Sequence, residues 1–380
     1  MRRLFFHVQH LLGIGHLRRA ATLARALTVG GFDVLLVSGG APALDLALDG
    51  VRFHQLPPLR AADETLRDLS RLDGMPLDDA FRASRTRQLL DLLQSERPDI
   101  LITEQFPFGR TRLRFELLPL LEVARTLQPR PLIVSSVRDV VRRASAERVQ
   151  EAVDIFRQSF DAALIHGDPR LVDFRKSFSG WAEIRTRAHY TGYVAEHDGM
   201  RRPGGRQGAG EVIVSVGGGA VGAPLLRAAV AARPKTPLAD RVWRLLVGAN
   251  LPHAEQATLA AQTGIVVEAA RPDFTTLLRN AALSISQAGY NTVIETLCCA
   301  DRAVLVPFAT ERETEQADRA QVLAEHGMVA VVPPDTLSAD SLAAGIRHAL
   351  DGPSIRSFPP FDINGGAKTA ALLHQLLAHV

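Results

Sequence analysis

A histidine stands in a glycine turn close to the start of the chain, in the run Gly13-Ile14-Gly15-His16. An apolar run precedes this turn and a helical pattern follows it, so we expect His16 at a strand-to-helix junction. A neutral imidazole can accept a proton at neutral pH, which makes His16 our candidate for a general base. A histidine that contacts phosphate or merely caps the helix is the alternative interpretation.

Glu104 follows the apolar run from Ile100 to Thr103 and is expected to face the same cleft as His16. It would orient His16, act as the base itself or bind a ligand. The loop after it holds side chains that suit a ligand with an apolar or anionic part, and that suit a packed loop almost as well: Phe106, Phe108 and Arg110. Lower-ranked candidates at the ends of later apolar runs are Arg138, Asp139, His166 and Asp168.

A second glycine turn lies in the other half of the chain, where Gly217 to Gly222 fits the pattern G-x-G-x-x-G. A dinucleotide-binding fold requires an acidic ribose ligand after the next strand, about 20 residues further on. Gly248-Ala249-Asn250 occupies that place, so we expect a phosphate cradle and no NAD. A tight turn without a ligand is the alternative.

A run of small and polar residues, Ser286 to Glu295, joins the end of an apolar strand to the start of a helix. The free N–H groups and the positive end of such a helix receive a diphosphate. Glu295 shares a helical face with Asn291, and its carboxylate would accept the hydroxyls of a ribose; a solvated surface glutamate is the alternative. The expected diphosphate contacts are Gly15, Gly217, Gly218, Gly219, Ala288, Gly289, Tyr290, Asn291 and Thr292.

A third polar loop, Pro307 to Gln316, follows another buried strand and is crowded with side chains that form hydrogen bonds. Sugar hydroxyls need paired donors and acceptors, which Glu315 and Gln316 would supply. A plain charged loop is the alternative for Glu311 to Glu313.

Short β-rich runs alternate with helical patterns throughout, which predicts an α/β protein with parallel sheets covered by helices on both faces. The expected strands of the first half are Leu4 to Val8, Asp33 to Val37, Ile100 to Thr103, Leu132 to Ser135 and Ala162 to Ile165. Those of the second half are Val212 to Val216, Val242 to Val247, Ile265 to Val267, Leu283 to Ile285, Ala303 to Val306 and Ala330 to Val332. We expect two Rossmann-like domains that face each other across a cleft, at 1–195 and 211–365, with a linker at 196–210 and a final helix at 366–380 that can cross the interface.

The second half resembles glycosyltransferase family 28 over roughly residues 211–335, through Asp273-Phe274, Leu283 to Thr292, Glu295, Pro307-Phe308, Glu315-Gln316 and Arg319-Ala320. This family includes the enzyme that adds N-acetylglucosamine to the lipid-linked peptidoglycan precursor. The first half matches it mainly at Gly13 to Arg19. The resemblance implies a GT-B fold and an inverting sugar transfer from a nucleotide-sugar donor, UDP-linked by default, to an unknown acceptor. It also implies no divalent metal in catalysis, and the sequence contains no Asp-x-Asp pair.

By the same resemblance, the C-terminal domain would bind the donor and the N-terminal domain the acceptor. Glu295 would hold the ribose, Gln316 with Glu315 the donor sugar, and Arg271 with Phe274 the nucleobase. The glycine turn at His16 also resembles that of the UDP-sugar hydrolase of pseudaminic acid biosynthesis, which attacks the donor with water. A hydrolase and a catalytically silent nucleotide-sugar-binding protein therefore stay open.

The composition bounds the remaining possibilities. A chain of 380 residues with 46 % hydrophobic residues can form two packed cores, and its formal net charge is +3. No basic run is interleaved with aromatic residues, so we expect no nucleic-acid partner. The neighbours Cys298 and Cys299 are expected to be small buried thiols. His7 and His10 interrupt the apolar start, so we expect no signal peptide and a cytoplasmic protein, with attachment to the inner face of a membrane left open.

Overall fold

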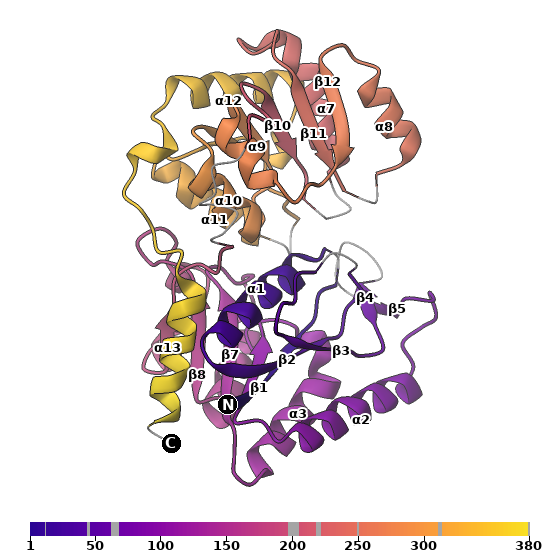
Figure 1. Cartoon of the computed structure of the whole chain (residues 1–380), viewed down its shortest axis with the longest axis vertical. Helices are drawn as coiled ribbons and strands as arrows, with labels where there is room; N and C mark the ends of the chain where they lie inside the picture. The colour runs from indigo at the N-terminus through magenta and orange to yellow at the C-terminus, as the bar shows by residue number, and fades with distance from the viewer. Residues whose placement is uncertain are drawn as a thin grey trace. The chain divides into compact units, whose positions relative to one another are not determined.

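The chain forms two compact units in the computed structural model, which describes residues 1–11, 13–43, 46–61, 68–196, 205–217, 222–248, 251–310 and 314–378. The first unit comprises Met1–Ala195 and Phe361–Val380, and the second comprises Glu196–Pro360. Each unit is built around a parallel sheet with helices beside it, which confirms the predicted α/β class (Figure 1).

The first unit contains a seven-stranded sheet in which every neighbouring pair of strands is parallel. Its strands are, in spatial order, β3 (Arg52–Gln55), β2 (Phe32–Ser38), β1 (Arg2–Val8), β6 (Ile100–Glu104), β7 (Leu132–Arg138), β8 (Ala162–His166) and β9 (Ala188–Tyr190). A separate antiparallel pair is formed by β4 (Leu59–Ala61) and β5 (Leu69–Arg71). The strand order changes direction between β1 and β6, and in open parallel sheets this switch point is where ligands bind.

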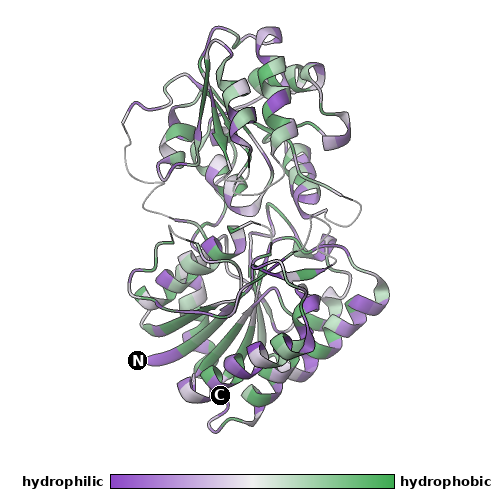
Figure 2. Cartoon of the chain, turned by 90° about the vertical axis from the view of Figure 1, so that its right-hand side faces the viewer, coloured by the Kyte–Doolittle hydropathy of each residue, from purple (hydrophilic) through white to green (hydrophobic). Residues whose placement is uncertain are grey.

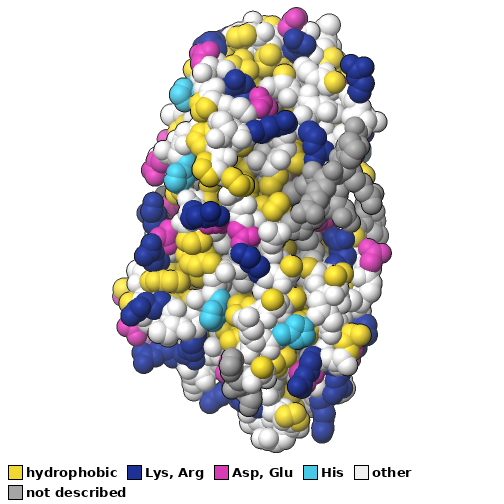
Figure 3. All heavy atoms as spheres, turned by 60° about the vertical axis from the view of Figure 1, so that its left-hand side comes forward, with side chains coloured by type: hydrophobic (Ala, Val, Ile, Leu, Met, Phe, Trp, Pro, Cys, Tyr) yellow, Lys and Arg dark blue, Asp and Glu magenta, His cyan; other side chains and the backbone are white. Residues whose placement is uncertain are grey.

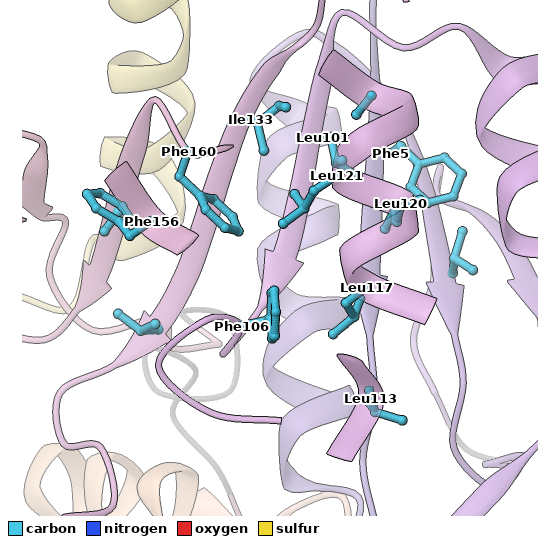
Figure 4. Packing of buried hydrophobic residues seen from close by; sticks show 14 of the residues in the cluster. Phe5, Leu101, Phe106, Leu113, Leu117, Leu120, Leu121, Ile133, Phe156 and Phe160 are labelled. Atoms are coloured by element: carbon cyan, nitrogen blue, oxygen red, sulfur yellow. The ribbon is translucent and has the colours of Figure 1, made fainter. Parts of the chain in front are cut away.

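Helices cover both faces of this sheet because successive strand residues point to opposite sides. Phe5 enters the core beneath α2 and α3, whereas Leu4 and Phe6 pack against α1 and α13. Figure 4 shows the first of these cores, in which Leu117, Leu120 and Leu121 contact residues of the sheet. The helices are α1 (Gly15–Val29), α2 (Asp79–Glu96), α3 (Arg114–Thr126), α4 (Ala146–Ser159), α5 (Trp181–Ile184) and α13 (Gly365–Leu377), with 3₁₀ turns at Thr111–Leu113 and Phe174–Lys176.

The second unit contains a six-stranded parallel sheet whose strands follow the same order as the first six of the larger sheet. Its strands are, in spatial order, β12 (Ile265–Ala269), β11 (Trp243–Val247), β10 (Val212–Ser215), β13 (Leu283–Ser286), β14 (Ala303–Leu305) and β15 (Ala330–Val331). Its helices are α7 (Ala223–Ala232), α8 (His253–Ala260), α9 (Phe274–Asn280), α10 (Tyr290–Cys299), α11 (Glu315–Glu325) and α12 (Ala339–Asp351), with 3₁₀ turns at Arg233–Lys235, Pro334–Thr336 and Ile355–Ser357. The switch point of this sheet lies between β10 and β13.

The distribution of apolar residues explains both architectures. In Figure 2 the strands of each sheet are mostly hydrophobic, whereas hydrophilic residues lie on the outer sides of the helices. Such near-continuous apolar strands are typical of parallel sheets that are buried on both faces. On the face drawn in Figure 3, Lys and Arg side chains are scattered among acidic, apolar and uncharged ones.

All eleven expected strands are present, with ends that differ by at most three residues. Two strands of the large sheet were not predicted, Arg52–Gln55 and Ala188–Tyr190. The first has a polar, half-exposed sequence and the second is only three residues long, so neither carries the apolar run that marks a buried strand.

The final helix, α13, belongs to the first unit and packs against α1 (Figure 1). Small residues allow this close approach, since a Cβ added to Gly366 would lie 2.5 Å from that of Ala26. The ring of His374 also stacks on Phe32, with centroids 4.4 Å apart. The chain therefore returns to the first unit after completing the second.

Candidate active site

The turn after β1 and the end of β6 bring His16 and Glu104 together at the switch point of the first sheet. His16 Nδ1 lies 2.6 Å from Glu104 Oε1, although the two residues are 88 positions apart in the chain. The Glu104 side chain is fully buried, whereas 18 % of the His16 side chain is exposed. The two residues that the sequence selected for acid–base chemistry thus form one hydrogen-bonded pair.

The groups around His16 and Glu104 determine the protonation state of each residue. Burial, followed by the guanidinium of Arg138, lowers the pKa of His16 to about 3, while Glu104 opposes this shift. Burial alone would raise the pKa of Glu104, but the hydrogen bond from His16 and the charges of Arg19 and Arg110 hold it well below its usual range. At neutral pH Glu104 is therefore ionised and His16 neutral, so Nδ1–H donates to the carboxylate and Nε2 remains an acceptor. A general base requires this protonation state.

The loop after β6 places its three predicted ligand-binding residues in different surroundings. Phe106 is fully buried in the core of the unit, where its side chain is labelled in Figure 4. Phe108 is half-buried and meets the ring of Phe178 edge-on, with centroids 5.0 Å apart. Arg110 has its Nε 3.9 Å from Glu104 Oε2. The structure therefore places Arg110 next to the His16–Glu104 pair and the two rings in the packing of the unit.

The lower-ranked candidates of the first unit take part in its internal hydrogen bonds. His166 is fully buried, with Nε2 2.9 Å from Ser136 Oγ and Nδ1 2.8 Å from Thr191 Oγ1. Asp168 accepts the backbone N–H of Asp362 at 3.0 Å. These contacts join strand ends and the returning C-terminal segment, and they give both residues a structural role.

A buried ion pair beneath this site carries no local sequence signal. Arg85 Nε donates to Glu116 Oε2 at 2.6 Å, and both side chains are fully buried. Arg85 also donates to Gln9 Oε1 at 2.9 Å and to the carbonyl oxygens of Gly39 and Pro57. One side chain of α2 thus holds the segments that come after β1, β2 and β3, including the segment that leads to His16.

In the second unit, α10 starts directly after β13, as predicted for a diphosphate site. Gly289 precedes its first residue, and a Cβ added to Gly289 would meet no heavy atom within 4 Å. The partly exposed face of α10 carries Asn291, Thr292 and Glu295, while Val293 and Ile294 are buried. The backbone N–H groups at a helix start attract anions, so this face has the chemistry of a phosphate site followed by a carboxylate.

Arg319 joins this loop to α11 in a way that the sequence did not indicate. Its Nη1 donates to the carbonyl of Ala288 at 3.1 Å, and its Nη2 donates to Glu315 Oε1 at 3.0 Å. Its guanidinium also lies over the ring of Tyr290, 5.7 Å from the centroid. The Tyr290 side chain is buried and Ala288 fully so, which places both side chains in the packing of the unit. The i,i+4 spacing of Glu315 and Arg319 is the only pattern that could have suggested this contact.

The other predicted donor-site residues lie on several different elements. Gln316 Oε1 accepts the backbone N–H of Phe308 at 3.1 Å, which ties α11 to the loop after β14. Arg271 binds both carboxylate oxygens of Asp273 at 2.7 Å, so its side chain is already paired. Phe274 is half-buried at the start of α9. Gly15 is the first residue of α1.

The glycine turn of this unit is only partly described. Gly217 has a left-handed φ of 64°, which favours glycine, and it follows the last residues of β10. Gly218 and Gly219 lie outside the described residues, as do Asn250 and Glu311 to Glu313. Within the described part of the chain, no three His, Cys, Asp or Glu side chains are grouped as metal ligands. None of the helices described there combines the length and apolar character that a membrane span requires.

Comparisons with known proteins relate the chain to a family and to a fold. Residues 213–357 match the glycosyltransferase family 28 C-terminal domain, which confirms the resemblance predicted for this half. The chain is 26 % identical over 273 residues to the UDP-N-acetylglucosamine–N-acetylmuramyl-(pentapeptide) pyrophosphoryl-undecaprenol N-acetylglucosamine transferase of Paraburkholderia xenovorans (strain LB400). That match covers 68 % of this chain and 64 % of the relative's length.

Two solved structures resemble the chain over nearly its full length. CalG4, the calicheamicin glycosyltransferase, superposes with a TM-score of 0.66 at 16 % identity, covering 100 % of this chain and 99 % of CalG4. MurG of Acinetobacter baumannii superposes with a TM-score of 0.59 at 14 % identity, covering 100 % of both chains. At these identities the likeness shows the fold, and it confirms the predicted GT-B class.

Proposed function

We propose that this chain, which belongs to glycosyltransferase family 28, transfers a sugar from a nucleotide-sugar donor to an acceptor hydroxyl, with inversion at the anomeric carbon and without a metal ion. The observation that carries the proposal is the hydrogen-bonded pair of His16 and Glu104 at the switch point of the first sheet. It provides a neutral imidazole with a free Nε2, which is what deprotonation of an acceptor requires.

The reaction would follow from this protonation state. His16 Nε2 takes the proton of the acceptor hydroxyl while the acceptor oxygen attacks the anomeric carbon of the donor sugar. The bond from that carbon to the phosphate oxygen breaks, and the nucleoside diphosphate leaves with the bonding electrons. The imidazolium formed on His16 is stabilised by the ionised Glu104 at 2.6 Å. A single displacement of this kind inverts the configuration of the anomeric carbon.

The second unit would bind the donor. The N–H groups at the start of α10, beside Gly289, would receive the diphosphate, and their positive partial charge stabilises it as it leaves. Glu295, one turn further along the partly exposed face, would accept the ribose hydroxyls. UDP is the proposed nucleotide because the name of the curated relative begins with a UDP-sugar. In this arrangement helix N–H groups perform the role that a divalent cation has in other transferases.

The first unit would bind the acceptor, with Arg110 next to the base. The name of the curated relative includes a pyrophosphoryl-undecaprenol acceptor. This supports an acceptor that is itself attached to a membrane, with the chain acting at the membrane surface.

The test combines calorimetry with NMR. UDP, GDP, dTDP and common UDP-sugars are titrated into the protein in EDTA, and turnover of each bound sugar nucleotide is followed with and without candidate acceptors. We expect selective binding of a UDP-sugar and acceptor-dependent release of UDP, with a product of inverted anomeric configuration. Turnover by water alone would indicate a hydrolase, and tight donor binding without any turnover would indicate a catalytically silent protein. Retained configuration or a requirement for a divalent cation would contradict the proposed mechanism.

A further inference from the structure

Arg19 lies one turn after His16 on α1 and reaches the same carboxylate. Its Nη2 donates to Glu104 Oε1 at 2.5 Å, and His16 Nδ1 lies 2.6 Å from that same oxygen. Residues three apart in a helix lie side by side, so one face of α1 directs two donors at one oxygen. Arg19 is only 2 % exposed, as is Glu104, so solvent does little to screen this contact.

We propose that Arg19 is a positioning residue for sugar transfer: by sharing Glu104 with His16, it holds the carboxylate ionised in one orientation and fixes the proton of His16 on Nδ1. The inference rests on the function proposed above for His16. Arg19 acts through Glu104 and contacts neither substrate.

The physical reason lies in the charge of the buried group. With only a neutral imidazole beside it, the Glu104 carboxylate would carry an uncompensated charge in a low dielectric, and such a group takes up a proton. If the proton stays on Glu104, the carboxyl donates to Nδ1 and the proton of His16 resides on Nε2. If it goes to His16, the ring becomes an imidazolium. In both states Nε2 is already protonated and cannot accept the acceptor's proton. Arg19 prevents both states by supplying the missing positive charge.

Other charged groups face this pair but do not replace Arg19. Arg138, at the end of β7, and Arg110, in the loop after β6, both lower the proton affinity of His16. Arg110 approaches the other oxygen of Glu104, Oε2, only to 3.9 Å. His166, at the end of β8, faces Arg19, and burial lowers the pKa of His166 well below its usual value, so it is neutral. These groups are unchanged in a variant at position 19, which isolates the effect of that side chain.

The test is ¹⁵N NMR of histidine-labelled protein across the pH range, with the signals of His16 assigned from a His16→Gln variant. We expect the wild-type ring to stay neutral with its proton on Nδ1 down to pH 5. In Arg19→Met we expect the apparent pKa to rise by about 1 to 3, so that at pH 5 Nε2 carries a proton, as an imidazolium or as the Nε2–H tautomer, in a larger fraction of the molecules than in the wild type. A wild-type tautomer and titration in Arg19→Met would overturn the proposal. Because this readout needs no turnover, it stands or fails separately from the proposed function.

Three further variants separate the effect of the Arg19 charge from the effect of its packing. Arg18 is the exposed neighbour of Arg19 on α1, so Arg18→Met should leave the His16 signals unchanged. If Arg19→Met does not fold, Arg19→Gln removes the charge while keeping a donor, and the same Nε2 protonation is expected. In kinetics, the acid limb of the kcat/KM profile should move to higher pH in the uncharged variants and return in Arg19→Lys. A loss of activity that is equal at every pH would show a purely structural role and would contradict the proposal.

Discussion

The two candidate sites occupy the same switch point of their respective sheets but are built from different groups. In the first unit the site consists of buried charged side chains, with His16, Arg19 and Glu104 joined through one oxygen. In the second unit it consists of a helix start, glycines and half-exposed polar side chains. The difference follows from the chemistry proposed for each. Proton transfer needs charges that are fixed in advance, whereas a diphosphate brings its own charge and needs only donors.

The largest expected effect of a single substitution lies in the first unit, at His16. We predict that His16→Ala lowers kcat for sugar transfer by about 10²- to 10⁴-fold, because general base catalysis is lost. Steady-state kinetics at saturating donor would measure this. Equal kcat values for the variant and the wild type would show that His16 takes no part in the chemical step. The site in the first unit would then have no identified base, like the site in the second unit.

Acid pH should act on the first unit before the second. Among the described residues, every histidine with a lowered pKa lies in the first unit: His7, His10, His16, His166 and His189. For His7, burial lowers the pKa from 6.5 to about 4, so the unfolded state binds the proton more strongly. Protonation of His7 in the unfolded state therefore lowers the free energy of unfolding as the pH falls from 6.5 to 4, by about 3 kcal/mol in total. Above pH 6.5 this loss is absent.

The chain contains one tryptophan in each unit, Trp181 and Trp243, so the two transitions can be followed separately. Fluorescence of Trp243→Phe reports on the first unit and that of Trp181→Phe on the second. Between pH 6.5 and 4 we expect the denaturation midpoint of the first unit to fall more steeply than that of the second. Parallel loss in both units would contradict the assignment of the buried neutral histidines to one site.

In the second unit we expect a smaller effect, on the affinity for UDP, from a substitution at Gly289. Gly289 has extended backbone angles, φ −64° and ψ 148°, and the space around its Cα is open, so Gly289→Ala should change the free energy of unfolding by about 1 kcal/mol or less. If the diphosphate lies there, the added methyl group weakens UDP binding by about tenfold, or 1.4 kcal/mol. Uridine, which has no phosphate, serves as the control and should bind as before. Unchanged UDP affinity would move the diphosphate away from α10.

The sequence predicted the parts of the molecule that have local signals. The strands of both sheets were predicted from their apolar runs, and the switch-point residues His16 and Glu104 from their positions directly after such runs. The pairing of these two residues could be expected only as one of several roles for Glu104, because periodicity places a side chain on a face without naming its partner. Arg85 and Glu116 are 31 residues apart on two helices, and nothing in either helix pattern marks them as an ion pair. Phe106 illustrates the same limit, since a phenylalanine at a strand end is equally consistent with a ligand contact and with core packing.

The central claim is that the second unit binds the donor and the first unit performs the chemistry. Its most direct test is to measure by calorimetry the affinity for UDP of the wild type, Glu295→Ala and His16→Ala. If the second unit holds the donor and the first performs the chemistry, Glu295→Ala loses about 1.5 to 3 kcal/mol of UDP binding, the value of a hydrogen bond to a charged group. His16→Ala, in contrast, binds UDP as the wild type does. Wild-type affinity in Glu295→Ala, or a comparable loss in His16→Ala, would contradict the account.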